Sequence, residues 1–119
     1  MTYGKDVLDG LREPVKELRQ RIPGVFDAYS SLGRTAMEDG ALDAKTKELI
    51  ALAVSVSKQC DGCMASHARG AARRGATEQE VAEALGVAIM MNGGPGTVHA
   101  PRAFDAFLEF KAALGSGSP

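Results

Sequence analysis

The spacing of the apolar residues constrains the fold of this chain more than any other feature. From residue 7 to residue 114, apolar side chains recur at intervals of three, four and seven positions. That is the period of amphipathic helices, and no segment shows the strict alternation of a half-buried strand. The sequence therefore predicts an all-α fold, a compact bundle of about six helices.

Prolines and glycines mark the ends of the first two helices. The first helix is expected to span about residues 7–22, with Pro14 inside it to kink or restart it. Pro23 suits the first position of a second helix, because its missing N–H would have no partner there in any case. Gly40 can close that helix in the left-handed conformation.

Capping residues mark the later helices. Asp43 is a suitable N-cap for a third helix that runs to about Ser57. The segment 60–75 has the pattern of a fourth helix that ends in arginines and a glycine. Thr77 and Glu80 form a capping box, which predicts the start of a fifth helix.

The length of 119 residues suits one domain with a modest core. After an interruption at 92–96, a last helical region reaches Leu114, so we expect one helical domain over 1–114 and a flexible tail over 115–119. Only 5% of the residues are aromatic, and there is no tryptophan. A core so poor in large side chains would gain from burying a face against another subunit, so we expect a homo-oligomer.

Charge and hydropathy narrow the class of protein. The net charge of −1 gives no basic surface for nucleic acid, and we expect Arg69, Arg73 and Arg74 to be a solvated helix face. No apolar run approaches the roughly 18 to 20 residues that span a bilayer, so no membrane contact is expected. The first ten residues lack the apolar core of a signal peptide, which favours a cytoplasmic location. In that reducing compartment, two cysteines favour a redox, catalytic or metal-binding role over a structural one.

Reactive side chains are concentrated in the pattern E-x11-C-x2-C-x3-H, formed by Glu48, Cys60, Cys63 and His67. Two thiols at this spacing can cycle between dithiol and disulfide. Cys63 and His67 are one helical turn apart, and an adjacent imidazole favours the nucleophilic thiolate. Cys60 is expected at a helix N-terminus, where the backbone N–H groups also favour an anion. Glu48 is expected at the border of an apolar helix face, where it could accept a proton.

Each of these residues also has an ordinary interpretation. Glu48 could be an edge residue paired with Lys45, with Lys47 or with a distant arginine. A lone cysteine is usually a small buried hydrophobe. The other histidine, His99, lies near an expected loop, where a histidine is usually structural or solvent-facing.

A zinc site is the main chemical alternative. Cys60, Cys63, His67 and either Glu48 or His99 could supply four ligands. Structural zinc sites more often contain a second Cys-x-x-Cys or a His-x3-His pair, and this chain has neither. The spacing therefore favours a site without metal or other cofactor.

The motif as a whole resembles the alkylhydroperoxidase D family, within the carboxymuconolactone decarboxylase superfamily. The matching residues are Glu48, the segment 60–63 and His67, supported by the segment 88–95. The resemblance covers roughly residues 20 to 110. It implies an all-helical oligomer, commonly a trimer or hexamer, and the activity of an antioxidant thiol-dependent peroxidase or disulfide reductase.

The resemblance also implies a role for each site residue. Cys63, the cysteine nearer to His67, would attack the peroxide, and Cys60 would resolve the resulting sulfenic acid as a disulfide. Glu48 and His67 would relay protons. An external dithiol, such as a lipoyl group or a thioredoxin-like protein, would restore the thiols.

One position departs from the family pattern. Better-known members carry a histidine immediately before the second cysteine, whereas this chain has Gly62 there, preceded by Asp61. The change removes a proton-relay group and adds a carboxylate that disfavours nearby thiolates. Two alternatives follow: a redox relay or sensor that exchanges disulfides with a partner protein, and a metal-binding or structural oligomer without peroxidase activity.

Overall fold

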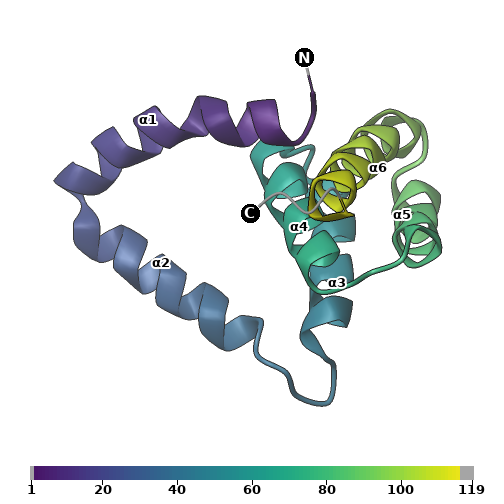
Figure 1. Cartoon of the computed structure of the whole chain (residues 1–119), viewed down its shortest axis with the longest axis horizontal. Helices are drawn as coiled ribbons and strands as arrows, with labels where there is room; N and C mark the ends of the chain where they lie inside the picture. Colours follow the sequence, from purple (N-terminus) through teal and green to yellow (C-terminus); the bar gives the residue numbers. More distant parts are fainter. Residues whose placement is uncertain (1, 116–119) are drawn as a thin grey trace.

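The structure, a computed structural model, describes residues 2–115, and these residues form six α-helices and no strand. The predicted all-α fold is therefore confirmed. Figure 1 shows helices α3 to α6 packed into one body, while α1 and α2 form an open V that extends from it. The helices are α1 (Lys5–Arg21), α2 (Pro23–Ala36), α3 (Ala44–Ser57), α4 (Asp61–Arg73), α5 (Glu78–Asn92) and α6 (Gly94–Gly115).

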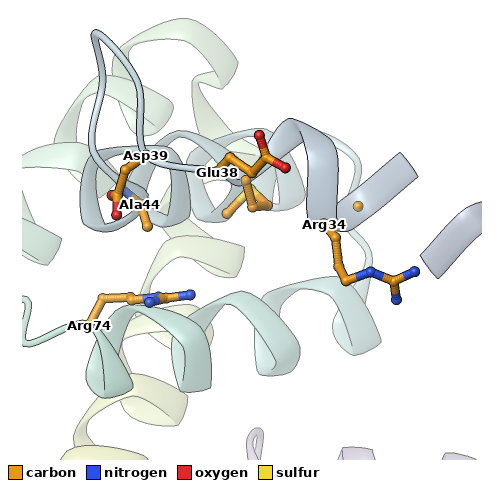
Figure 2. Close-up of a pocket in the computed structure, with 7 residues that line it drawn as sticks. Arg34, Glu38, Asp39, Ala44 and Arg74 are labelled. Atoms are coloured by element: carbon orange, nitrogen blue, oxygen red, sulfur yellow. The ribbon is translucent and has the colours of Figure 1, made fainter. Parts of the chain in front are cut away.

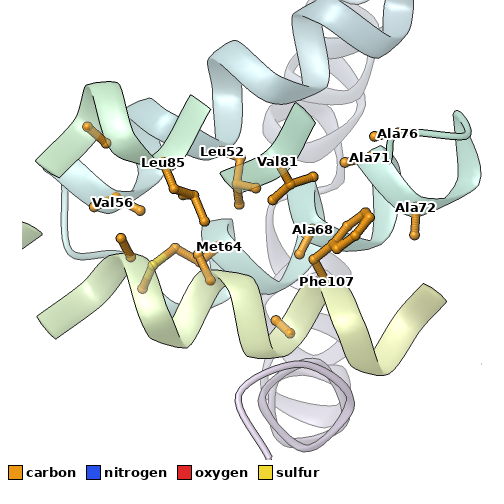
Figure 3. Close-up of a cluster of buried hydrophobic side chains, with 14 residues drawn as sticks. Leu52, Val56, Met64, Ala68, Ala71, Ala72, Ala76, Val81, Leu85 and Phe107 are labelled. Atoms are coloured by element: carbon orange, nitrogen blue, oxygen red, sulfur yellow. The ribbon is translucent and has the colours of Figure 1, made fainter. Parts of the chain in front are cut away.

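The hydrophobic core lies between α3, α4, α5 and α6 and consists largely of small side chains (Figure 3). Alanine supplies most of its buried residues, and Phe107, Leu52, Val56 and Val81 are the largest side chains that are fully buried. Small side chains let the helix axes approach closely. At Gly96 the approach is so close that a Cβ atom would lie 2.9 Å from the Cα atom of Ile89.

Several predicted helix ends are confirmed by their hydrogen bonds. The Asp43 side chain accepts a hydrogen bond from the Thr46 N–H at 2.8 Å at the start of α3. The capping box is complete: Thr77 Oγ1 accepts from the Glu80 N–H at 3.1 Å, and Glu80 Oε1 accepts from the Thr77 N–H at 2.8 Å. At the end of α4, Gly75 has a φ of 78°.

Two predicted boundaries are wrong, and the helix restart that was one of two expectations at Pro14 does not occur. Helix α1 continues through Pro14 without a restart, because the Gly10 carbonyl that loses its partner lies on an exposed face where water can satisfy it. Helix α2 ends at Ala36, with Met37 as its C-cap, and Gly40 does not adopt a left-handed conformation. The interruption expected over 92–96 shrinks to one left-handed residue, Gly93, after which α6 begins at once.

The first two helices bury none of their residues. The N-terminal end of α1 is anchored, because the Lys5 N–H donates to Glu109 Oε1 at 2.8 Å and Gly4 lies against α6. Further along, the apolar residues that sequence periodicity places in a core are exposed, for example Leu32 at 63% and Tyr29 at 73%.

Within residues 2–115, no helix is both long enough and apolar enough to cross a membrane. Of the expected C-terminal tail, only Gly115 belongs to the described part, as the last residue of α6, and residues 116–119 lie outside it.

Candidate redox site

The two cysteines lie at the N-terminal end of α4 and are joined by a disulfide bond. Cys60 is the N-cap residue, and its Sγ accepts a hydrogen bond from the Cys63 N–H at 3.2 Å. The S–S distance is 2.11 Å and the two Cα atoms are 5.2 Å apart. Cys60 is half-buried, whereas Cys63 is exposed. Cys60 at the N-cap and Cys63 in the first turn therefore both lie at the start of α4, where unpaired N–H groups and the helix dipole stabilise negative charge.

A tight turn after α3 delivers Cys60 to this position. Gln59 has a φ of 53°, a left-handed conformation that is uncommon for any residue except glycine. Its N–H donates to the Val56 carbonyl and the Cys60 N–H donates to the Ser55 carbonyl. Together these bonds form a Schellman motif, so the end of α3 and the N-cap of α4 are separated by two residues.

The carboxylate and the imidazole of the motif form a pair between α3 and α4. His67 Nδ1 lies 3.0 Å from Glu48 Oε2, and the Glu48 side chain is only 14% exposed. An ionised carboxylate can only accept a hydrogen bond, so with Glu48 in that form Nδ1 is the donor. In the neutral ring with the hydrogen on Nδ1, Nε2 has a lone pair that can accept a proton. The lysines that sequence reasoning offered as partners of Glu48 bind elsewhere: Lys45 pairs with Glu80, and Lys47 donates to the Glu38 carbonyl.

Gly70, which sequence reasoning missed, makes this pair possible. A Cβ atom at Gly70 would lie 2.3 Å from Glu48 Oε2 and 2.4 Å from Glu48 Cδ. No real Cβ contact is that short, so any larger residue would displace the carboxylate. The available sequence signal is a glycine three residues after His67, on the side of α4 that faces α3.

Gly62, the residue immediately before Cys63, is close to α1. A Cβ atom at Gly62 would lie 2.9 Å from Leu11 Cδ1, so α1 occupies space that a side chain at this position would need. The absence of the family's histidine at Gly62 thus coincides with the packing of α1 over the start of α4.

The second histidine does not join this site. His99 lies within α6, not near a loop as its sequence context suggested. Its Nδ1 atom is buried and makes no hydrogen bond within the described part of the chain. The same part of the chain contains no group of three His, Cys, Asp or Glu side chains arranged to hold a metal ion.

The segment 88–95, which supported the resemblance, forms the corner between α5 and α6. Asn92 Nδ2 donates to the Ala88 carbonyl at 2.7 Å and to Ser57 Oγ at 2.8 Å. Because Ser57 is the last residue of α3, this bond fixes the end of the helix from which the turn to Cys60 departs.

Comparison with known proteins places this helical chain in a family. Residues 23–106 match the carboxymuconolactone decarboxylase family, and the chain belongs to that family. An uncharacterised protein of Haemophilus influenzae is 42% identical over 111 residues, which cover 93% of this chain and 98% of that protein. An uncharacterised protein of Cupriavidus necator is 41% identical over 90 residues, covering 76% of this chain and 80% of its own.

Solved structures show the same architecture. A carboxymuconolactone decarboxylase family protein from Legionella pneumophila, solved in its apo form, superposes with a TM-score of 0.83. It is 42% identical, and the match covers 87% of this chain and 92% of that one. A family member from Thermotoga maritima, for which a part in the antioxidative response has been suggested, has a TM-score of 0.77 at 27% identity and covers 97% of both chains.

Proposed function

We propose that this protein is a thiol-dependent oxidoreductase that reduces hydroperoxides with the Cys60–Cys63 pair. The observation that carries the proposal is the disulfide at the start of α4 together with the Glu48–His67 pair, in which His67 lies on α4 and Glu48 on α3. A suggested antioxidative role for the Thermotoga maritima relative supports the same chemistry. The physiological reductant would be a dithiol, either a lipoyl group or a thioredoxin-like protein.

The reaction has two steps in the protein. In the first, the Cys63 thiolate attacks the terminal oxygen of the hydroperoxide, an S–O bond forms, the O–O bond breaks, and the alcohol leaves after taking up one proton. In the second, Cys60 attacks the sulfenic acid on Cys63, the S–S bond forms, and water leaves. Overall, one hydroperoxide and two thiols give one alcohol, one water and the disulfide.

Glu48 and His67 would manage the protons of both steps. His67 lies one turn after Cys63, and its Nε2 is free to take the thiol proton and to return a proton to the leaving oxygen. Glu48 holds the ring through Nδ1 and stabilises the imidazolium that forms when Nε2 is protonated.

The first test is the intact mass of reduced protein, with thiol alkylation, before and after one equivalent of cumene hydroperoxide. We expect both alkylation sites to disappear and the mass to fall by two hydrogens.

Cys60→Ser should stop at a sulfenic acid on Cys63, which a dimedone adduct would reveal, and Cys63→Ser should not consume peroxide. Glu48→Gln and His67→Ala should fold normally and slow the reaction by about 100-fold. Full activity of Cys63→Ser would refute the assignment of the attacking thiol.

Disulfide exchange with a partner protein is a second candidate, favoured by two observations. Cys63 is exposed at the surface, and Gly62 stands where better-known relatives carry a relay histidine. In that case the partner's dithiol would be oxidised as Cys60–Cys63 is reduced, or the reverse. This function would be selected if the reduced thiols remained alkylatable after hydroperoxide while the Cys60–Cys63 disulfide still oxidised the dithiol of a reduced thioredoxin-like protein.

A further inference from the structure

Arg69 and Arg73 on α4, and Arg74 at its C-cap, have no anionic partner within the part of the chain that the structure describes. Arg69, Arg73 and Arg74 make neither an ion pair nor a side-chain hydrogen bond to a carboxylate within residues 2–115. Among the lysines and arginines of residues 2–115, only Lys5, Arg12 and Lys45 are paired with a carboxylate, so the lack of a partner does not by itself distinguish these three arginines. The sequence alone suggested an ordinary solvated face, but the structure gives these arginines a particular setting.

The three arginines line one pocket beside the redox site. The pocket has a volume of about 310 Å³, and its other walls are Glu48, Ser66 and Gly70. Three cations therefore face one carboxylate, and that carboxylate already accepts a hydrogen bond from His67 through Oε2. The pocket keeps a positive balance of two charges if His67 is neutral.

The positive charge in this pocket affects the pKa of Arg69. Arg69 is half-buried, and its pKa is lowered, first by burial and second by the charge of Arg73. A bound anion would offset both effects, because it would pair with the cations and replace the water that burial removes.

Arg74 also borders a second pocket, of about 510 Å³, between the end of α2 and the start of α3 (Figure 2). In Figure 2, Arg74 lies across that pocket from Glu38 and Asp39. Asp39 already accepts a hydrogen bond from the Ala44 N–H at 2.7 Å. Because acidic groups face Arg74 here, Arg69 and Arg73 are the cations best placed to bind an anion.

An apolar pocket continues from the cationic one toward the cysteines. It has a volume of about 370 Å³ and shares Ser66 and Arg69 with the cationic pocket. One wall is the part of α1 that carries Leu8, Leu11 and Val15, and the pocket also contacts Gly62, the residue next to Cys63. Arg12 of α1 lines it as well, but its guanidinium is paired with Asp9. The two pockets together form a groove along α4, apolar near the redox pair and cationic further along.

From this arrangement we infer that the groove binds a small amphipathic carboxylate, with its anionic group between Arg69 and Arg73 and its apolar chain against α1. Planar guanidinium groups bind carboxylates through paired hydrogen bonds, which favours arginine over lysine at such a site. The inference rests on the proposed function in one respect: if the pair reduces hydroperoxides, its preferred substrate carries a carboxylate.

Binding can be tested without any redox chemistry. The probe is sodium octanoate, titrated into the full-length protein while amide NMR shifts are followed, with 1-octanol as the uncharged comparison. We expect octanoate to shift the amides of Ser66, Gly70 and Arg73, and 1-octanol to bind at least tenfold more weakly. The double variant Arg69→Gln/Arg73→Gln should weaken octanoate binding by about tenfold or more, the cost of losing one charge-assisted contact.

Two variants serve as controls. Arg69→Lys/Arg73→Lys keeps both charges and should retain most of the binding. Arg21→Gln removes one positive charge from the exposed end of α1, far along the chain from the groove, and should bind octanoate like the unchanged protein. Equal binding of octanoate and octanol, or unchanged octanoate binding by the double glutamine variant, would refute the inference.

A second measurement separates this inference from the proposed function. A fatty-acid hydroperoxide and its methyl ester differ only in the carboxylate, and we expect the acid to have the higher kcat/KM, by a factor that the double glutamine variant removes. If octanoate binds as expected but no hydroperoxide oxidises the cysteines, the groove stands and the peroxidase proposal fails. If cumene hydroperoxide is reduced but octanoate does not bind, only the groove is refuted.

Discussion

At the scale of single residues, the proposed proton relay depends on the space above one glycine. Glu48 contacts His67 beside Gly70, and a Cβ atom at Gly70 would lie 2.3 Å from Glu48 Oε2, so only glycine leaves room for the carboxylate in this position. Glycine costs helix stability of about 1 kcal/mol relative to alanine in a helix interior. Gly70 thus lowers the stability of α4 but leaves room for the Glu48 carboxylate beside His67.

The variant Gly70→Ala should separate these two effects. We expect it to push Glu48 away from His67 and to slow disulfide formation about as much as Glu48→Gln does. The free energy of unfolding should change little, because the gain in helix propensity offsets a lost hydrogen bond of about 1 kcal/mol. Stopped-flow oxidation kinetics measure the first effect and urea denaturation the second. Long-range proton–nitrogen NMR of the His67 ring would show directly whether Nδ1 has lost its partner.

Gly86 provides the matched control. It lies in the interior of α5, is exposed, and has open space where its Cβ would be. Gly86→Ala should stabilise the protein by about 1 kcal/mol and leave the oxidation rate unchanged. An oxidation rate for Gly70→Ala equal to that of the unchanged protein would show that Gly70 does not position Glu48.

At the scale of helices, one ion pair connects the first turn of α3 to the first turn of α5. Lys45 Nζ lies 2.8 Å from Glu80 Oε2, while Glu80 Oε1 accepts the capping hydrogen bond from the Thr77 N–H. The pKa of Glu80 is lowered, first by its bond to Lys45 and then by the bond from Thr77. The pKa of Lys45 is raised by the same partner.

These shifts predict how stability depends on pH. Because Glu80 ionises more readily in the folded chain, its charge contributes stability above its ordinary pKa of 4.5, and that contribution is lost as the pH falls below it. Glu80→Gln keeps a residue suited to the capping box and removes only the charge. We expect this variant to be less stable than the unchanged protein at pH 7, with a difference that shrinks below about pH 4.5, as measured by urea denaturation across pH.

An exposed glutamate on α1 tests whether the effect is specific. Glu17→Gln removes a similar charge from a residue on the exposed part of α1. Its stability should follow that of the unchanged protein at both pH values. A difference for Glu80→Gln that stayed constant from pH 7 to pH 3 would contradict the role given to its charge.

At the scale of the whole molecule, α1 and α2 form a V (Figure 1), and within residues 2–115 the apolar side chains of this V, such as Leu18, Val25 and Leu32, are exposed. Helix α2 has 14 residues, and helices of this length are marginal in water unless an apolar face is buried. The body exposes apolar residues as well, including Ile50, Val54 and Met90. The chain therefore exposes apolar residues both on the V and on the helical body, and both surfaces would be buried if the V of one copy packed against the body of another.

We therefore predict a homo-oligomer, a trimer or hexamer if it follows the family resemblance. Light scattering should give a mass that is a multiple of the 12.4 kDa chain at micromolar concentration. Tyr29→Glu/Leu32→Glu places charges on the apolar face of α2 and should shift the protein towards monomer. Ser31→Glu, on the opposite side of the same helix, should leave the mass unchanged. A stable monomer at that concentration would contradict the prediction.

Sequence by itself determined the local structure of this protein. Helix type follows from apolar periodicity, and the starts of α3 and α5 follow from Asp43 and Thr77, because capping is a matter of a few adjacent residues. The pairing of Cys60 with Cys63 could be predicted in the same way, since the two residues are three positions apart at the start of one helix. Local signals failed at Gly40 and at 94–96, where glycine permits a turn but neighbouring packing decides whether one forms.

Only the tertiary structure decided which distant residues meet. Glu48 and His67 are 19 positions apart, and their contact depends on how α3 packs against α4 and on the space left by Gly70. Periodicity marked the apolar faces of α1 and α2 but not their exposure, because a helix pattern records that a face is apolar and not what covers it. The pocket lined by Arg69, Arg73 and Arg74 likewise depends on the tertiary structure, because Glu48 of α3 forms one of its walls. The sequence gives the charges but not which groups face them after the helices pack.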